Sequence, residues 1–156
     1  MKFLTTLALF AGVAAAQSKP TALTGVWRIT EVTTTGPRAV KFSNPQPGLF
    51  MFTAKHYSMM WVHGEKPRAD ADVSKATDAE LLAMWRAFSA QSGTYEVSGA
   101  TVTLRPITAK STVNMRPGRY LTYSFKVEGN TLAISTVRTS EGPTENPETM
   151  KLTRVE

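Results

Sequence analysis

The chain has no cysteine, so disulfides and thiol chemistry contribute nothing to its fold or function. A bacterial lipid anchor also needs a cysteine at the cleavage point, and we therefore expect none. No hydrophobic run is long enough to span a bilayer as a helix. The nucleophile elbow, the phosphate-binding loop and the dinucleotide fingerprint do not occur. Stability must then come from interior packing, and no common enzyme class is indicated.

The excess of positive charge is modest and dispersed. Eighteen Lys and Arg residues against twelve Asp and Glu give a formal charge of +6. The basic residues form no dense run interleaved with aromatic residues, which is the pattern of nucleic-acid binding. We expect no nucleic-acid partner, whereas attraction to acidic ligands is compatible with this charge.

The first sixteen residues have the pattern of a secretion signal. Met1-Lys2 supplies a positive start, residues 3–13 are apolar, and Ala14-Ala15-Ala16 suits a signal peptidase. We expect cleavage before Gln17, which leaves residues 17–156 as one domain. The expected location is the bacterial periplasm or the extracellular space.

The stretch from Gly48 to Val62 contains the strongest β-forming signal. Residues 49–53 and 57–62 are rich in Phe, Met, Tyr and Trp, and the short polar break Ala54-Lys55 separates them. This spacing predicts an antiparallel hairpin. Neither run alternates cleanly between apolar and polar residues, so both faces must be covered or one face must line a cavity.

Further strands and one helix are expected around this hairpin. Thr77 to Glu80 forms a capping box, and apolar residues at helical spacing predict a helix over residues 77–91. Residues 36–47 hold three prolines and are expected to form a long surface loop. The other predicted strands are residues 23–35, 92–97, 101–108, 119–128, 131–138 and 148–155. Eight strands in up-and-down order predict an all-β, antiparallel barrel, with the helix covering an open end.

Three stretches together resemble the lipocalin-like domain family of bacteria and fungi. They are Gly25-Val26-Trp27, the run from Pro47 to Met59, and the order of a helix followed by residues 92–97 and later 132–136. The resemblance spans nearly all of residues 17–156 and implies a calycin-type barrel with an internal pocket, without implying an activity. The histidine and the arginine that relatives often carry near Thr101 and Ser124 are absent here. A ligand role tied to those two groups therefore does not carry over.

A structural contact is expected between Trp27 and Arg154. The pair resembles the lipocalin arrangement in which a late arginine stacks on the tryptophan of the first strand. Such stacking closes the barrel floor through a cation–π contact and hydrogen bonds to the chain ends.

The candidate ligand site is the aromatic and thioether-rich interior. On residues 56–63, the face with Tyr57, Met59 and Trp61 opposes the face with His56 and Met60, and the sequence leaves open which points inward. A pocket of this kind suits apolar ligands. The residues expected to contact a ligand are Phe50, Phe52, His56, Met59, Met60, Trp61, Tyr120, Tyr123, Phe125 and Arg138.

Acid–base and metal chemistry have few candidates. His56 and His63 are seven residues apart, face opposite sides of a straight strand, and have no companion at ligand spacing, so no metal site or cofactor is expected. Solvent exposure is favoured for Glu31 and Glu96. The leading hypothesis is an exported barrel that binds a small, apolar or amphipathic molecule. The alternatives are an isomerase or cyclase with one histidine as acid or base, and a packed barrel with an interaction surface.

Overall fold

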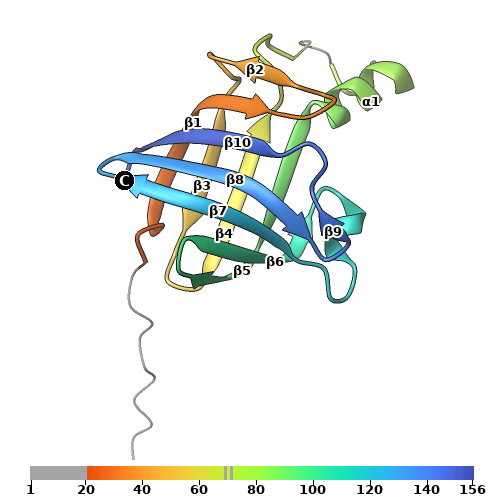
Figure 1. The fold of residues 1–156 in the computed structure, drawn as a ribbon. Coiled ribbons are helices and arrows are strands. Elements are labelled where there is room, and N and C mark those ends of the chain that lie inside the picture. Colours follow the sequence, from red (N-terminus) through yellow and green to blue (C-terminus); the bar gives the residue numbers. More distant parts are fainter. Residues whose placement is uncertain (1–20, 69, 71) are drawn as a thin grey trace, which may run out of the picture.

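Eight antiparallel strands close into a barrel in the computed structural model, which describes residues 21–68, 70 and 72–156 (Figure 1). Pairing of β8 with β10 closes the ring. The predicted eight-stranded, antiparallel, up-and-down barrel is therefore confirmed, whereas the predicted export signal lies outside the described residues. In pairing order the barrel strands are β10 (Glu148–Arg154), β1 (Gly25–Thr34), β3 (Gly48–Phe52), β4 (His56–Val62), β5 (Phe88–Ser98), β6 (Thr101–Ala109), β7 (Leu121–Glu128) and β8 (Thr131–Thr139).

Two short strands extend the sheet beyond the barrel. β2 (Val40–Phe42) pairs with the second half of β1, and β9 (Gly142–Pro143) pairs with the end of β8. β1 is twice as long as β3 and pairs with it only through Arg28, so the free edge of its second half needs another partner. The predicted loop 36–47 supplies that partner, and Phe42 packs against the core.

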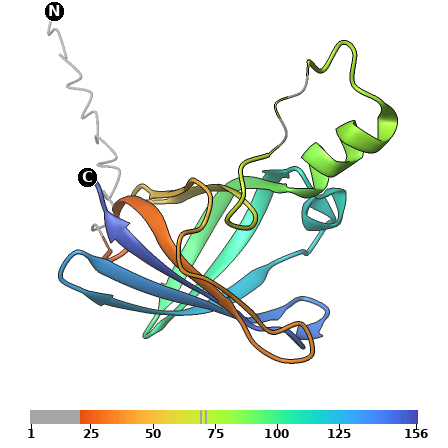
Figure 2. The ribbon, with the colours of Figure 1, turned by 90° about the horizontal axis from the view of Figure 1, so that it is seen from above.

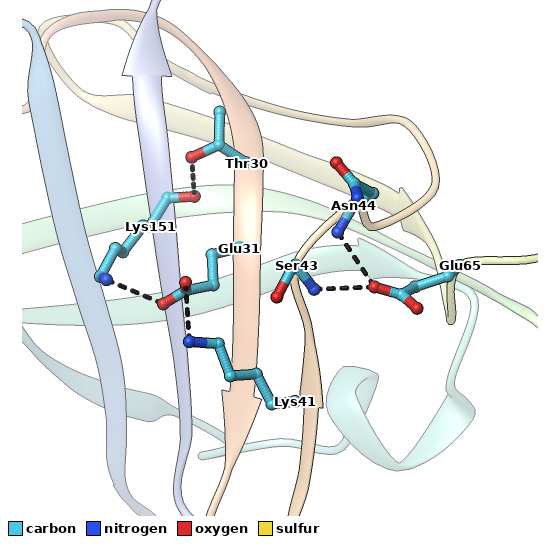
Figure 3. Close-up of polar contacts among 7 residues, drawn as sticks. All are labelled: Thr30, Glu31, Lys41, Ser43, Asn44, Glu65 and Lys151. Carbon is cyan, nitrogen blue, oxygen red and sulfur yellow. Dashed lines mark hydrogen bonds and ion pairs between the residues drawn. The ribbon is translucent and has the colours of Figure 1, made fainter.

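A β-bulge in β1 decides which of its side chains point outward. The register with β10 shifts between Ile29 and Glu31. Because the bulge adds one residue, Trp27, Ile29 and Val32 are all buried while Glu31 turns outward. There the Glu31 carboxylate contacts Lys151 Nζ at 2.8 Å and Lys41 Nζ at 3.1 Å (Figure 3). These hydrogen bonds hold the pKa of Glu31 below its usual range.

A second carboxylate fastens the loop that precedes β3. Glu65 Oε1 accepts the backbone N–H groups of Ser43 at 2.7 Å and of Asn44 at 3.0 Å (Figure 3). The side chain of Gln46 also donates to the Glu65 carbonyl oxygen. The proline-containing loop is thus held against the segment that follows β4.

One end of the barrel is a packed floor. Trp27 is fully buried, and its Nε1 donates to the Leu23 carbonyl oxygen at 2.7 Å. The Arg154 guanidinium lies 4.0 Å from the centroid of the Trp27 ring and donates to the carbonyl oxygens of Thr24 and Ala22. The expected stacking contact is present, and it ties the first strand to the last. The other fully buried side chains of the core are Leu23, Phe50, Met59, Val102, Leu104, Leu132, Ile134 and Leu152.

The helix α1 (Asp78–Arg86) begins as predicted but ends early. Thr77 and Glu80 form the capping box with both of its hydrogen bonds. The prediction that the helix continues to residue 91 is wrong, because residues 88–91 pair with β4 as the start of β5. No residue of α1 is buried, and Figure 2 shows it beside the barrel end rather than across it. The helix therefore borders the opening instead of covering it. No helix in the described part of the chain has the length and apolar character needed to cross a bilayer.

Candidate functional site: a pocket at the barrel mouth

A pocket of about 570 Å³ opens at the barrel end that α1 borders. Its inner wall comes from strands β4, β5 and β7, and its rim from the end of α1 and from residues 110–114, which include the 3-10 helix η1 (Thr112–Met115). This volume lies within the range of small-molecule sites. The lining residues are Trp61, Trp85, Arg86, Ser89, Ala90, Gln91, Lys110, Ser111, Thr112, Asn114, Leu121 and Tyr123.

The predicted interior residues divide between this pocket and the packed core. Phe50, Phe52 and Met59 are buried in the core, and Phe125 packs against it. Trp61 and Tyr123 line the pocket. On β4 the inward face is therefore the one that carries Tyr57, Met59 and Trp61. The sequence alone did not decide which face of residues 56–63 points inward, and burial of Tyr57 and Met59 in the barrel answers this question.

Four of the predicted ligand contacts belong neither to the pocket lining nor to the packed core. His56 and Met60 are on the outer face of β4, because side chains alternate along a strand, and Met60 is 38% exposed. Arg138 is exposed because a register shift in the β7–β8 pair places it opposite Thr122 on the outer face. Tyr120 is half-buried just before β7 and is not part of the lining. Placing His56, Met60 and Arg138 in the interior was therefore wrong.

The polar centre of the pocket is Gln91, which the sequence analysis missed. Among the described residues, Gln91 is the polar residue that is buried, with 6% of its surface exposed. Asn114 Nδ2 donates to Gln91 Oε1 at 3.1 Å, and Gln91 Nε2 lies 4.0 Å from the sulfur of Met59. Strand alternation carried upstream from Tyr95 would have placed Gln91 on the inner face. That signal was lost because residues 88–91 were assigned to the helix.

Two tyrosines and one glutamate make the upper interior polar. Tyr57 and Tyr123 are buried, and the Tyr57 hydroxyl has no hydrogen-bond partner among the described residues. Burial raises the pKa of both phenols, so they are neutral. Burial also raises the pKa of Glu148, which lines a smaller pocket on the other side of Trp61. The interior thus holds hydroxyl donors beside a carboxyl group that is costly to ionise.

Replacement of Glu148 by glutamine is expected to stabilise the protein in a pH-dependent way. A raised pKa in the folded state means that Glu148 favours folding when protonated, and this contribution is lost as the pH rises through the folded pKa. Glu148→Gln should therefore be more stable than the wild type at pH 7 and equal to it below about pH 4, where the carboxyl is protonated in both states. Urea unfolding at both pH values tests this. A stability difference that is the same at pH 7 and at pH 4 would contradict it.

Neither histidine is part of the lining of the mouth pocket. His56 is exposed at the start of β4. His63 follows β4, where its Nε2 lies 2.8 Å from Ser89 Oγ and its ring lies 5.5 Å from the Trp61 ring. Burial and the charge of Lys110 lower the pKa of His63, which favours the neutral ring. In the ranges the structure describes, no group of three His, Asp or Glu side chains could hold a metal ion.

The fold and the site define a closed antiparallel β-barrel with a packed floor and a ligand-sized pocket at its mouth. Comparisons of the chain with models of protein families, with curated proteins and with solved structures find no match. Function is therefore inferred from the geometry of the pocket.

Proposed function

We propose that the protein is an exported calycin-type barrel that binds one small, largely apolar molecule in the mouth pocket. The observation that supports this most directly is the 570 Å³ opening, which reaches inward-facing residues of three barrel strands. The resemblance of Gly25-Val26-Trp27, with Arg154 on the ring of Trp27, supports the calycin-type assignment. Export rests on the pattern of residues 1–16 alone.

The proposed driving force is burial of ligand surface against aromatic and aliphatic side chains. Trp61, Leu121 and Tyr123 form the inner wall, and Trp85 extends it at the rim. A ligand that buries about 300 Å² of apolar surface gains about 7.5 kcal/mol. That free energy corresponds to a dissociation constant in the micromolar range. It is an upper limit on the affinity, because binding also costs the ligand translational and rotational freedom.

The two alternative functions have less support. A histidine-dependent isomerase or cyclase would need a histidine in the pocket. His56 is outside the barrel, and His63 is bonded to the lining residue Ser89 but is not itself part of the lining. A fully packed interaction module would have no pocket, and here the packed region ends below Gln91 and Tyr123. Small-molecule binding is therefore the function that the geometry favours.

Trp61→Ala is expected to weaken ligand binding at least tenfold. Trp61 contributes the largest apolar side chain of the inner wall, and losing its contact area removes more than the roughly 1.4 kcal/mol that a tenfold change requires. The measurement is titration with N-phenyl-1-naphthylamine, a neutral apolar probe whose fluorescence rises on burial. Native mass spectrometry of the purified protein, beside a denatured sample, would show any retained ligand.

The matched control is Met60→Ala. Met60 is the neighbour of Trp61 on the same strand but points away from the interior. Its replacement should leave probe binding within about twofold of the wild type. A wild-type protein that shows no saturable probe binding would refute the proposed function. Equal affinities of the two variants would refute the assignment of the site to the mouth pocket.

A further inference from the structure

We propose that the ligand of the mouth pocket is an anionic amphipath, with a carboxylate at its polar end. This inference rests on the proposed function and specifies the chemistry of the ligand. It is carried by the charges and the hydrogen-bonding groups that line the pocket.

The charged side chains of the lining are both positive. Arg86 comes from the last turn of α1 and Lys110 from the residue after β6, and no Asp or Glu is part of the lining. Glu148 interacts electrostatically with Tyr123 but lies in a separate, smaller pocket that shares Trp61 with the mouth pocket. An anion that enters the mouth therefore meets two cations without a facing carboxylate.

Lys110 is held in place by the backbone. Its Nζ donates to the carbonyl oxygens of Trp85 and Phe88, and it lies 4.8 Å from the centroid of the Trp85 ring. An ammonium group has three N–H donors, so one is left for a ligand. Burial also lowers the pKa of Lys110, and a bound anion would favour its charged form. Because this cation is fixed before binding, little side-chain entropy is lost when an anion binds.

The amides and the hydroxyls beside Lys110 can also serve a carboxylate. Gln91 Oε1 accepts from Asn114, and the Gln91 amino group, which contacts the Met59 sulfur at 4.0 Å and interacts with Tyr123, is a buried donor on the pocket wall. Tyr123 has a neutral hydroxyl on the same wall, and Ser111 and Thr112 add hydroxyls at the rim. A carboxylate is an acceptor with about four lone-pair sites, so it can satisfy several of these donors together. An ammonium head would instead meet two repelling charges, Arg86 and Lys110, in the lining.

The test compares three ligands with the same ten-carbon chain. Decanoate, decanol and decyltrimethylammonium compete with N-phenyl-1-naphthylamine for the pocket at pH 7 and low salt. We expect decanoate to displace the probe at a concentration at least tenfold lower than decanol, and the cation to be the weakest competitor. The advantage of decanoate should shrink as salt is raised, because the rim is open to solvent. Equal potency of decanoate and decanol would overturn the inference and leave the proposed function standing.

Variants that remove one positive charge test which side chains cause the preference for decanoate over decanol. Arg86→Gln and Lys110→Gln should each reduce the ratio of decanoate potency to decanol potency about threefold or more. Arg86→Gln keeps the contacts of Lys110 with the end of α1, so it reports on charge without disturbing that end. The matched control is Arg28→Gln, which removes one positive charge from the exposed outer face of β1. A loss of equal size in Arg28→Gln would show that net charge alone is responsible, and would overturn the inference. Absence of any saturable binding in the wild type would refute this inference and the proposed function together.

Discussion

Trp27→Ala is expected to lower the free energy of unfolding by about 3–5 kcal/mol. The ring is fully buried in the barrel floor, where it supports Arg154 and donates to the Leu23 carbonyl oxygen. Its removal leaves a cavity, an unpaired buried carbonyl and a guanidinium without its aromatic surface. Since domains of this size have a total stability of about 5–15 kcal/mol and this chain has no disulfide, the loss is a large share of the total. Urea unfolding followed by far-ultraviolet circular dichroism measures it.

Trp85→Ala provides the matched control for this change. Trp85 is 59% exposed on α1, and no residue of that helix is buried. The same chemical change there should alter the free energy of unfolding by no more than about 0.5 kcal/mol. If the two variants unfold at the same urea concentration, the packed floor does not stabilise the barrel in the way described.

Gly93→Ala is expected to destabilise the barrel by about 3 kcal/mol or more. A Cβ at Gly93 would lie 2.0 Å from the Arg105 carbonyl oxygen and 2.9 Å from Ile107 N, which are backbone atoms of the facing strand. The β5–β6 register shifts between Ser92 and Gly93, at the point where Pro106 of β6 has no N–H to donate. Only glycine lets the two backbones approach this closely, so the methyl group must force the strands apart.

Gly93→Ala is also expected to change the geometry of the mouth pocket. Gln91 pairs with Ala109 directly beyond the bulge, and Lys110 follows Ala109. A displaced bulge moves both donors, so Gly93→Ala should weaken probe binding as well as stability. Gly129→Ala is the control, because a Cβ there meets open space and the φ of +57° costs about 1–2 kcal/mol. If Gly93→Ala and Gly129→Ala had the same free energy of unfolding, this explanation of the bulge would be contradicted.

Local features of the fold could be predicted because their causes are local. The hairpin of β3 and β4 follows from two aromatic-rich runs around Ala54-Lys55, and the register of the pair agrees with it. Gly129-Asn130 joins β7 and β8 as a two-residue turn, with Gly129 at positive φ. The capping box of α1 depends on Thr77 and Glu80 alone. Each of these signals lies within a few residues of the structure it determines.

The errors occur where a distant strand overrides the local pattern. Phe88 to Gln91 continue the helical periodicity of α1, but pairing with β4 satisfies their backbone groups within the sheet and adds them to β5. The register shift in the β7–β8 pair places Arg138 on the outer face of the barrel, although the sequence analysis expected it in the interior. A period-two pattern has no information on such insertions, because one extra residue exchanges the two faces of a strand.

By itself the sequence determined the number of barrel strands, their hairpin order and the pairing of Trp27 with Arg154 as structural residues. The tertiary structure alone decided where packing ends and the pocket begins. Phe50 and Trp61 are both aromatic and inward-facing, yet one is buried in the floor and the other lines the opening. The difference depends on what the closed sheet brings against them from β5, β7 and residues 110–114, and these contacts exist only once the ring has closed.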